Sequence, residues 1–199
     1  MIVGLTGGIG SGKTTVAKLF QQFNTVAVYI ADVEAKRIMN SCEVVQMELI
    51  QAFGEETFLG NQLNKEYIAG IVFNNKEKLE LLNSIIHPAV YKDFERFVLK
   101  NIAKRYIIYE SAILFESSST HKFDFLITVF VPFEEQVRRV LVRDKTTKQA
   151  VLARINAQWR ADKKILLSNY VIYNTKFEST EIVVHHIHNI LTKKRDIIS

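Results

Sequence analysis

Residues 7–14, Gly-Gly-Ile-Gly-Ser-Gly-Lys-Thr, fit the pattern GxxxxGK[ST] of a loop that binds phosphate groups. In such a loop, backbone N–H groups surround the phosphate oxygens, a lysine reaches the β- and γ-phosphates, and a hydroxyl group holds Mg²⁺. Lys13 and Thr14 stand at the positions for the last two tasks. The expected triphosphate ligands are Gly8, Gly10, Ser11, Gly12, Lys13, Thr14 and Thr15.

The residues on both sides of this loop suit the same chemistry. An apolar run, residues 2–5, precedes it, and apolar residues at helical spacing follow it between Val16 and Phe23. A phosphate loop needs this order of strand, turn and helix, because the positive end of the helix supports the bound phosphates. An ordinary glycine-rich turn with an exposed lysine is the alternative, and it does not require this context.

Asp32 follows a second apolar run, residues 26–30, so we expect it at the same edge of a parallel sheet as the phosphate loop. Phosphoryl transfer needs a carboxylate that orients the acceptor hydroxyl group and takes its proton. Asp is also a favoured N-cap, and a helical pattern begins at residue 33. The sequence therefore leaves two roles open for Asp32, general base and helix cap.

Glu110 follows a third apolar run, residues 106–109. An acid directly after a buried strand, beside a phosphate loop, can support the metal ion through a water molecule. An acidic residue that faces solvent at a strand end is the alternative. Thr14 is thus the expected direct Mg²⁺ ligand, and Glu110 the expected indirect one.

Residues 143–168 are rich in Arg and Lys and predict a basic helical lid. Arg143 and Arg154 flank this stretch, and an arginine placed over the bridging oxygens of a triphosphate stabilises the transition state. Both are candidate ATP ligands, and Arg143 is a candidate catalytic residue beside Lys13. Arg139 lies four residues after Glu135, which favours a solvated ion pair on one helix.

Two groups of histidines could also do chemistry. His87 and Pro88 interrupt a helical pattern between residues 79 and 98, so we expect a helix boundary or kink that turns His87 inward. A buried structural histidine is the alternative. The late histidines have ordinary helical spacing, which does not favour a metal site. They are His185, His186 and His188.

Five short apolar runs predict a doubly wound α/β core with a mainly parallel, five-stranded sheet. The runs cover residues 2–5, 26–30, 106–109, 125–131 and 170–173. Two of the connections are too long for simple crossovers. We therefore expect a nucleotide-binding core, a helical acceptor-binding insertion and a helical lid. The core comprises residues 1–32, 106–142 and 169–199, the insertion residues 33–105, and the lid residues 143–168.

The chain has 199 residues and a formal net charge of +5. Its basic residues are spread along the sequence, which favours small polyanions over nucleic acid. Cys42 is the single cysteine, so no internal disulfide can form, which is typical of a cytoplasmic protein. No apolar run suits a signal peptide or a membrane span. We expect a cytoplasmic monomer without nucleic-acid or membrane partners.

Several segments together resemble the dephospho-CoA kinase family over nearly the whole chain. Residues 5–15 are close to the opening of that family, and Ala31-Asp32 stands where its DAD-type motif falls. Leu82–Pro88 resembles its LN-x-x-x-HP segment, and Ile113–Glu116 is similar to its PLLFE signature. The remaining similar segments are Arg143-Asp144 and Arg154–Gln158 in the lid, and Val171–Asn174 at the last strand.

This resemblance implies a P-loop kinase fold and ATP-dependent phosphorylation of the ribose 3′-hydroxyl group of dephospho-CoA to form coenzyme A, with Mg²⁺ as cofactor. It implies that Asp32 is the general base and that residues 33–105 bind CoA, whose long pantetheine arm suits a helical groove. It also implies substrate contacts from Lys36 and His87, and an ATP contact from Asn174.

The chain departs from the family pattern at several positions. Ile30 replaces the first acid of the DAD motif, and Lys36 stands where an arginine is usual. Lysine lacks the planar fork of arginine, so a phosphate contact at this position is weaker or reached differently. The other departures are Glu110 for Asp, Ala112 for Pro, and Ser168-Asn169 for Ala-Asp.

Another small-molecule kinase of the phosphate-loop class, acting on a nucleoside, nucleotide or sugar, is the main alternative function. Only the His87-Pro88 and lid segments argue against it. A nucleotide-dependent switch would carry a guanine-reading Asn-Lys-x-Asp motif, which the chain lacks. A binding module without catalysis is disfavoured because Lys13, Thr14 and Asp32 are all present.

Overall fold

The computed structural model describes residues 1–72, 75–117 and 120–198. Contacts within the chain divide it into two compact units. The larger unit comprises Met1–Ile30 and Asn101–Ser199, and the smaller unit comprises Ala31–Lys100. The smaller unit is therefore an insertion in the sequence of the larger one, which stops at Ile30 and resumes at Asn101.

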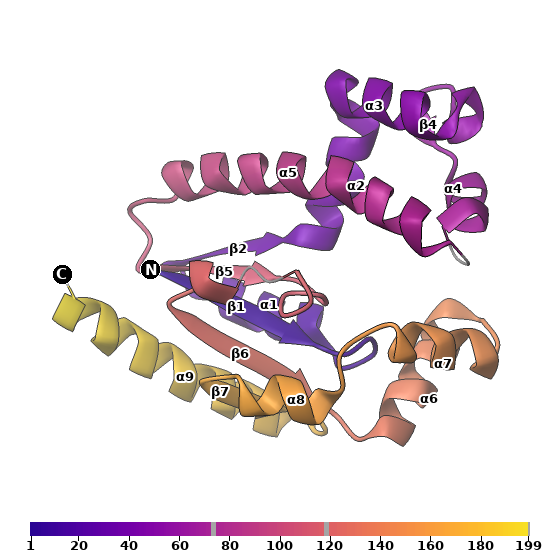
Figure 1. Ribbon diagram of the computed structural model, residues 1–199. Coiled ribbons are helices and arrows are strands. Elements are labelled where there is room, and N and C mark those ends of the chain that lie inside the picture. The colour runs from indigo at the N-terminus through magenta and orange to yellow at the C-terminus, as the bar shows by residue number, and fades with distance from the viewer. Residues whose placement is uncertain (73–74, 118–119, 199) are drawn as a thin grey trace. The chain divides into compact units, whose positions relative to one another are not determined.

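The larger unit is built on a five-stranded sheet in the order β2-β5-β1-β6-β7 (Figure 1). All neighbouring strands are parallel, which confirms the predicted sheet. Because they are parallel, the carboxyl ends of the strands share one edge of the sheet. The strands are β1 (Ile2–Gly7), β2 (Val26–Ile30), β5 (Tyr106–Glu110), β6 (Phe125–Phe130) and β7 (Tyr170–Tyr173).

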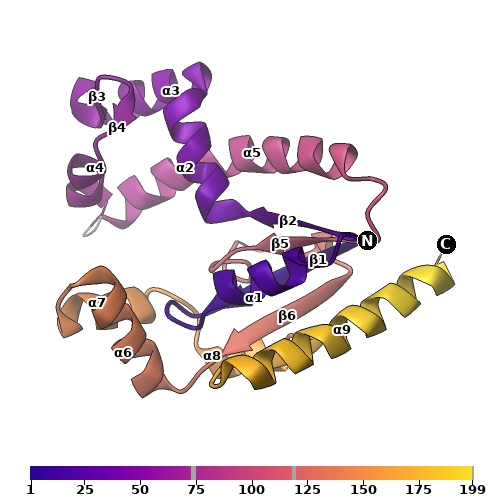
Figure 2. The ribbon, with the colours of Figure 1, turned by 180° about the vertical axis from the view of Figure 1, so that it is seen from behind.

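Helices cover both faces of this sheet, as a doubly wound fold requires (Figures 1 and 2). The helices α1 (Lys13–Gln21) and α9 (Phe177–Ile198) pack together on one face, and α8 (Ala161–Leu166) packs against β6 on the other. Before α8 come α6 (Phe133–Asp144) and α7 (Lys148–Asn156). The main core lies between the sheet and the α1–α9 pair and includes Leu5, Phe20, Tyr106, Ile108, Ile127, Ile172 and Leu191.

The smaller unit is mainly helical, as its apolar patterns predict. Its helices are α2 (Ala31–Ser41), α3 (Glu43–Phe53), α4 (Lys65–Val72) and α5 (Lys76–Lys100). A 3₁₀ helix (Glu55–Thr57) and a short hairpin of β3 (Phe58–Leu59) and β4 (Gln62–Leu63) lie between α3 and α4 and were not predicted. The buried apolar residues of this unit include Ile38, Val45, Leu49, Phe53, Ile68, Ile86, Val90 and Phe94.

The helix boundary predicted at Pro88 is wrong, because α5 runs through this residue over 25 positions. A proline inside a helix removes one hydrogen bond and costs about 3 kcal/mol. Burial of Ile86, Val90 and Phe94, and the packing of α5 against α2, α3 and α4, offset this cost. Tertiary packing therefore overrides the local signal.

Candidate active site

Residues 8–12 form the turn between β1 and α1. Gly10 and Gly12 have φ angles of 77° and 85°, in the left-handed region that glycine adopts without strain. There is also no room for a side chain, because a Cβ atom on Gly12 would lie 2.1 Å from Nδ2 of Asn174. The helix α1 begins directly after Gly12, so its positive N-terminal end lies at the loop.

Helix α6 supports the first half of this loop. Ile9 packs into a small apolar cluster with Val137 and Val140 of α6 and Val151 of α7. The side chain of Gln136, also on α6, lies so close to Gly8 that a Cβ atom there would be 2.5 Å from its Nε2 atom. The loop is thus held from outside by residues that follow β6 in the chain.

Asn174 supports the second half of the loop. Its Nδ2 atom donates a hydrogen bond of 2.8 Å to the carbonyl oxygen of Ser11, and its Oδ1 atom accepts one of 3.0 Å from Thr180. The side chain is buried, with 7% exposure. Sequence reasoning placed Asn174 among the ATP ligands, whereas its contact with the phosphate loop runs through the Ser11 carbonyl.

Lys13 and the two following threonines begin α1. Lys13 is 9% exposed, and its Nζ atom donates a hydrogen bond of 3.3 Å to the carbonyl oxygen of Gly8, across the loop. Thr14 and Thr15 are exposed at the first turn of the helix. Lys13, Thr14 and Thr15 therefore lie at the end of the loop at which the helix dipole is positive.

Glu110 is the last residue of β5 and only 2% exposed. It is paired in register with Leu5 of β1 on one side and with Ile30 of β2 on the other. The solvent-facing alternative is therefore wrong, because this strand end still has a neighbouring strand on both sides. A carboxylate in such a place needs nearby positive charge or hydrogen-bond donors.

Asp32 is the second residue of α2, which starts at Ala31 directly after β2. The N-cap alternative is wrong, because the strand runs into the helix and the helical residues begin before Asp32. Its side chain is exposed in the first turn, where the helix dipole favours a negative charge. Asp32 follows Ile30 by two residues, and Ile30 is the register partner of Glu110.

The two lid arginines predicted to bind ATP share one carboxylate, that of Asp144. Arg143 donates to Oδ1 from Nε at 2.6 Å and to Oδ2 from Nη2 at 3.1 Å, and Nη1 of Arg154 donates to Oδ2 at 2.6 Å. The hydrogen bond from Arg143 first, and that from Arg154 second, hold the pKa of Asp144 well below its usual range. Asp144 thus brings both arginines to one place at the end of α6.

The sequence did not predict which residues surround Arg139. The expected ion pair with Glu135 is present at 2.7 Å. The Nη2 atom of Arg139 also donates a hydrogen bond of 2.9 Å to the carbonyl oxygen of Asn174, and its Nη1 atom would be 3.4 Å from a Cβ atom on Gly12. Arg139 therefore lies beside the phosphate loop, a position that no local spacing indicates.

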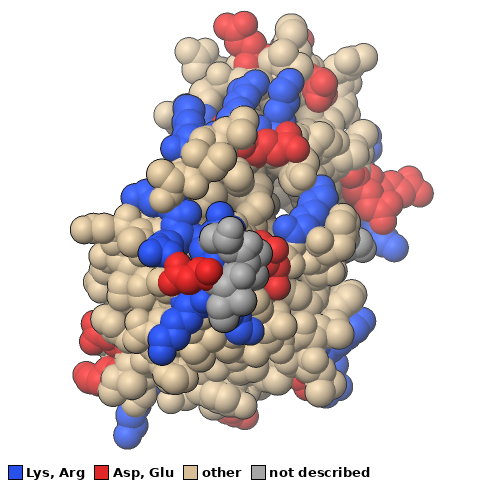
Figure 3. All heavy atoms as spheres, turned by 90° about the vertical axis from the view of Figure 1, so that its left-hand side faces the viewer, with Lys and Arg blue, Asp and Glu red and all other residues tan. Residues whose placement is uncertain are grey.

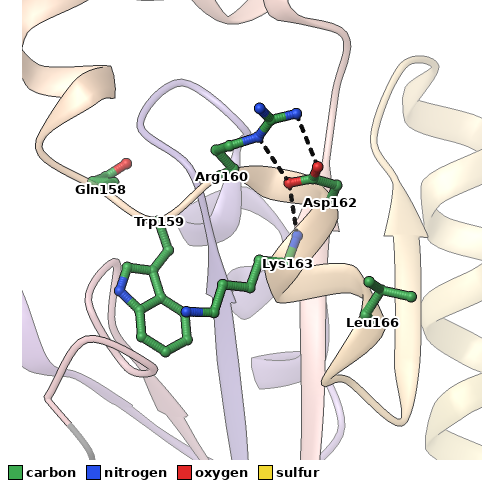
Figure 4. Close-up of a pocket in the computed structure, with 6 residues that line it drawn as sticks. All are labelled: Gln158, Trp159, Arg160, Asp162, Lys163 and Leu166. Carbon is green, nitrogen blue, oxygen red and sulfur yellow. Dashed lines mark hydrogen bonds and ion pairs between the residues drawn. The ribbon is translucent and has the colours of Figure 1, made fainter.

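A pocket of 420 Å³ lies beside α8 (Figure 4). Its lining residues are Gln158, Trp159, Arg160, Asp162, Lys163 and Leu166. The Nζ atom of Lys163 lies 3.3 Å from the centre of the Trp159 ring, and this ring stacks against Phe115 with 6.1 Å between the centres. Gln158 also accepts a hydrogen bond from the backbone N–H of Ile9, so the pocket adjoins the phosphate loop.

The late histidines pack against aromatic rings. His188 stacks on Phe23 with 3.7 Å between the ring centres, and its Nδ1 atom lies 2.8 Å from the hydroxyl group of Tyr106. Within residues 1–72, 75–117 and 120–198, no group of three or more His, Cys, Asp or Glu side chains is arranged to hold a metal ion.

Comparison with known proteins agrees with this geometry. The family model CoaE, dephospho-CoA kinase, matches residues 1–179. A dephospho-CoA kinase of Bacteroides fragilis is 36% identical over 172 residues, which are 86% of this chain and 83% of the relative. The chain belongs to the dephospho-CoA kinase family.

Solved structures show the same fold. The crystal structure of TT1252 from Thermus thermophilus matches with a TM-score of 0.84 and 30% sequence identity over 97% of each chain. The dephospho-CoA kinase from Campylobacter jejuni matches with a TM-score of 0.64 and 19% identity, over 96% of this chain and 97% of its own. The second likeness supports the fold alone.

Lys36, one of the departures from the resembled family pattern, is exposed. The guanidinium group of the neighbouring Arg37 binds Glu34 at 2.5 Å and Asp93 at 2.8 Å. These two hydrogen bonds raise the pKa of Arg37 above its usual value. Lys36 and His87 are both exposed residues of the smaller unit, and the buried alternative for His87 is wrong.

Ser168 and Asn169, another departure from the resembled family pattern, have side chains that bind the sheet. The Oδ1 atom of Asn169 accepts a hydrogen bond of 2.7 Å from the backbone N–H of Leu126, at the start of β6. The hydroxyl group of Ser168 lies 2.6 Å from that of Thr128. Both replacements therefore support β6 and β7 without reaching the phosphate loop.

Proposed function

We propose that this chain transfers the γ-phosphoryl group of ATP to the ribose 3′-hydroxyl group of dephospho-CoA and so forms coenzyme A. The observation that carries the proposal is the match of the family model over residues 1–179, combined with a glycine cradle at the carboxyl edge of a parallel sheet. Open α/β sheets bind their ligands at this edge.

The triphosphate would lie in the phosphate loop. Backbone N–H groups of the loop would contact its oxygens, Lys13 would reach the β- and γ-phosphates, and the N-terminus of α1 would add favourable charge. The left-handed φ angles of Gly10 and Gly12 support this placement, because they let the backbone turn tightly around a phosphate group. The ATP ligands of the proposal are Gly8, Gly10, Ser11, Gly12, Lys13, Thr14, Thr15, Arg143, Arg154 and Asn174.

The oxygen groups at the loop suit Mg²⁺, which prefers hard oxygen ligands and keeps several waters. The exposed hydroxyl group of Thr14 would bind the ion directly, and the buried Glu110 carboxylate would support it through a water molecule. When bound, Mg²⁺ neutralises part of the charge on the triphosphate. Arg143 would stabilise the negative charge that develops on the transferred group.

Asp32 would act as the general base. Its carboxylate is exposed and is not used as a helix cap, and it follows the carboxyl end of β2, which shares an edge with the end of β1. It would accept a hydrogen bond from the 3′-hydroxyl group and take its proton as the new O–P bond forms, while the bond from the γ-phosphorus to the bridging oxygen breaks and ADP leaves. Residues 33–105 would hold the rest of the acceptor, with contacts from Lys36 and His87.

Small polyanionic substrates also suit the surface. On the face shown in Figure 3, Lys and Arg side chains alternate with Asp and Glu and with uncharged residues, without one broad basic area. Among the described residues, no helix has the length and apolar character needed to cross a membrane. From the spread of its basic residues along the sequence and its single cysteine, we propose a cytoplasmic monomer that binds neither nucleic acid nor membranes.

A panel of acceptors tests the function. Purified protein with Mg²⁺ and ATP is offered dephospho-CoA, nucleosides, nucleotides or sugars, and ADP release is followed for each. Coenzyme A is the matched negative control, because its 3′-hydroxyl group is already phosphorylated. We expect rapid transfer to dephospho-CoA alone. Rapid transfer to another alcohol, with none to dephospho-CoA, would refute the proposal.

A further inference from the structure

The segment between α7 and α8 contacts two loops of the active site. Gln158 accepts a hydrogen bond of 2.9 Å, through Oε1, from the backbone N–H of Ile9 in the phosphate loop. The next residue, Trp159, donates a hydrogen bond of 2.8 Å from its backbone N–H to Oε1 of Glu116, in the loop after β5. We call residues 158–164 the strap, because they join these two loops. The strap comprises the end of the segment before α8 and the first four residues of α8.

The strap ends in a buried lysine. Lys164 has 0% exposure, and its Nζ atom lies 2.8 Å from Oε1 of Glu116 and donates a hydrogen bond of 2.8 Å to the carbonyl oxygen of Ala112. A buried ammonium group is costly unless it is paired and hydrogen-bonded, and this one is both. Oε1 of Glu116 therefore contacts both the backbone N–H of Trp159, near the start of the strap, and the ammonium group of Lys164, at its end.

The contact with Ala112 reaches the strand end that carries Glu110. Ala112 follows Glu110 by two residues, and the intervening Ser111 donates a backbone hydrogen bond of 3.0 Å to Leu5 of β1. Lys164 thus holds the chain at the point where β5 turns away from the sheet. Through Gln158, the same strap holds the peptide of Ile9, whose side chain is fixed by α6 and α7.

An ion pair of this kind is a poor way to gain stability alone, because well-packed apolar residues of similar volume are often as stable or more so. Oε2 of Glu116 is buried without a hydrogen-bond partner among the described residues, so this pair is not optimised for stability. What the pair provides is a defined position for the Ala112 carbonyl group, which accepts from Lys164. Transfer of a phosphoryl group depends mainly on positioning, and a misplacement of about 1 Å can reduce the rate by about 10²-fold.

We propose that Gln158, Glu116 and Lys164 form a positioning network for phosphoryl transfer, which holds the Ile9 peptide of the phosphate loop and the chain after Glu110 in one constant arrangement. The inference rests on the proposed kinase activity. None of the three side chains is assigned a contact with the reacting atoms, so they act through the two loops that they hold.

Three variants test the ion pair: Lys164→Met, Glu116→Gln, and the two together. The measurements are the melting temperature, kcat, and KM for ATP and for dephospho-CoA. Each single variant leaves one buried polar partner uncompensated, so we expect a lower melting temperature. The double variant removes both charges, and its glutamine can still accept from Trp159. We expect its melting temperature to return close to that of the unmodified protein.

The activity of the double variant decides between positioning and stability. Neither methionine nor glutamine can replace the bond from Lys164 to the Ala112 carbonyl. We therefore expect kcat to stay about 10- to 100-fold low, with both KM values within about threefold of the unmodified protein. Recovery of kcat together with the melting temperature would overturn the proposal. Lys193→Met, at an exposed lysine of α9, is the matched control and should leave kcat and melting temperature unchanged.

Gln158→Met provides a second arm that does not depend on the buried pair. The side chain is only half-buried, so we expect this variant to fold with nearly unchanged melting temperature. The Ile9 N–H group loses its acceptor, and we expect kcat to fall about tenfold while the affinity for Mg²⁺-ADP is retained. An unchanged kcat would contradict the network. If the unmodified protein transfers phosphate to an acceptor other than dephospho-CoA, the same measurements are made with that acceptor. Failure of the proposed substrate can then be distinguished from failure of the positioning network.

Discussion

The side-chain amide of Asn174 donates a hydrogen bond of 2.8 Å to the backbone carbonyl oxygen of Ser11. Both residues are buried, so water cannot replace either partner of this hydrogen bond without a cost in free energy. Loss of one partner of a buried hydrogen bond costs about 1–3 kcal/mol. The end of β7 therefore sets the shape of the phosphate loop, although 163 residues separate the two positions in the sequence.

We expect Asn174→Ala to weaken ATP binding, because the Ser11 carbonyl loses its donor and the loop relaxes. KM for ATP should rise about tenfold, and the melting temperature should fall. Steady-state kinetics and calorimetry measure the two effects. Thr180→Val removes the hydroxyl group that donates to Asn174 Oδ1 and also contacts the Lys176 carbonyl oxygen, and should have the same effect in weaker form. A lower melting temperature with unchanged KM for ATP would mean that Asn174 has no influence on the phosphate loop.

Gly12→Ala should abolish ATP binding while leaving the rest of the fold formed. The φ angle of 85° is unfavourable for alanine, and the new Cβ atom would lie 2.1 Å from Asn174 Nδ2. The loop must then change shape or displace Asn174. Titration calorimetry with Mg²⁺-ADP measures the loss. Gly70→Ala is the matched control, since a Cβ atom there meets nothing within 4 Å. Normal nucleotide affinity in Gly12→Ala would show that the observed loop is not the binding conformation.

Asp32→Asn tests the general base. Asparagine retains the size of the side chain and can still contact the acceptor, but it cannot take a proton at neutral pH. We expect kcat to fall roughly 10²–10⁴-fold with little change in ATP affinity. Rapid-quench measurement of coenzyme A formation separates the chemical step from product release. A variant that turns over as fast as the unmodified protein would remove Asp32 from the mechanism.

His188 makes stability depend on pH. Burial first, and the neighbouring charge of His185 second, lower the pKa of His188 below its usual value. The unfolded chain therefore binds this proton at a higher pH than the folded chain does. The stabilising contribution is present above the ordinary histidine pKa of about 6.5 and is lost as the pH falls below it. Phe23 and Tyr106 surround the ring, and burial keeps the pKa of the Tyr106 hydroxyl group above its usual value, outside this range.

Urea unfolding between pH 7.5 and 5.5 measures this dependence. We expect the free energy of unfolding to fall toward the acidic end in the unmodified protein. His188→Gln cannot titrate and should show a flatter profile, whatever its stability at neutral pH. His186→Gln, on the same helix, controls for a general effect of removing one histidine. An equally steep profile in His188→Gln would assign the dependence to other groups.

Patterns confined to neighbouring residues predicted much of this protein. Apolar runs located the five sheet strands, and helical spacing located α1, α6, α9 and the helices of the smaller unit. Where a prediction failed, contacts with residues outside the segment determined the structure. Pro88 stays within α5 because buried neighbours outweigh one lost hydrogen bond, and Glu110 is buried because β5 has a strand on each side.

By itself, the sequence determined the phosphate-binding motif, the order of the elements and the family, because these depend on residue types at short, fixed spacings. Only the tertiary structure decided that Gln158 binds Ile9 across 149 residues, that Asn174 binds Ser11, and that Lys164 is buried against Glu116. Hydrogen bonds and ion pairs form between atoms about 3 Å apart in space, and a linear sequence carries no local trace of which distant segments folding brings that close.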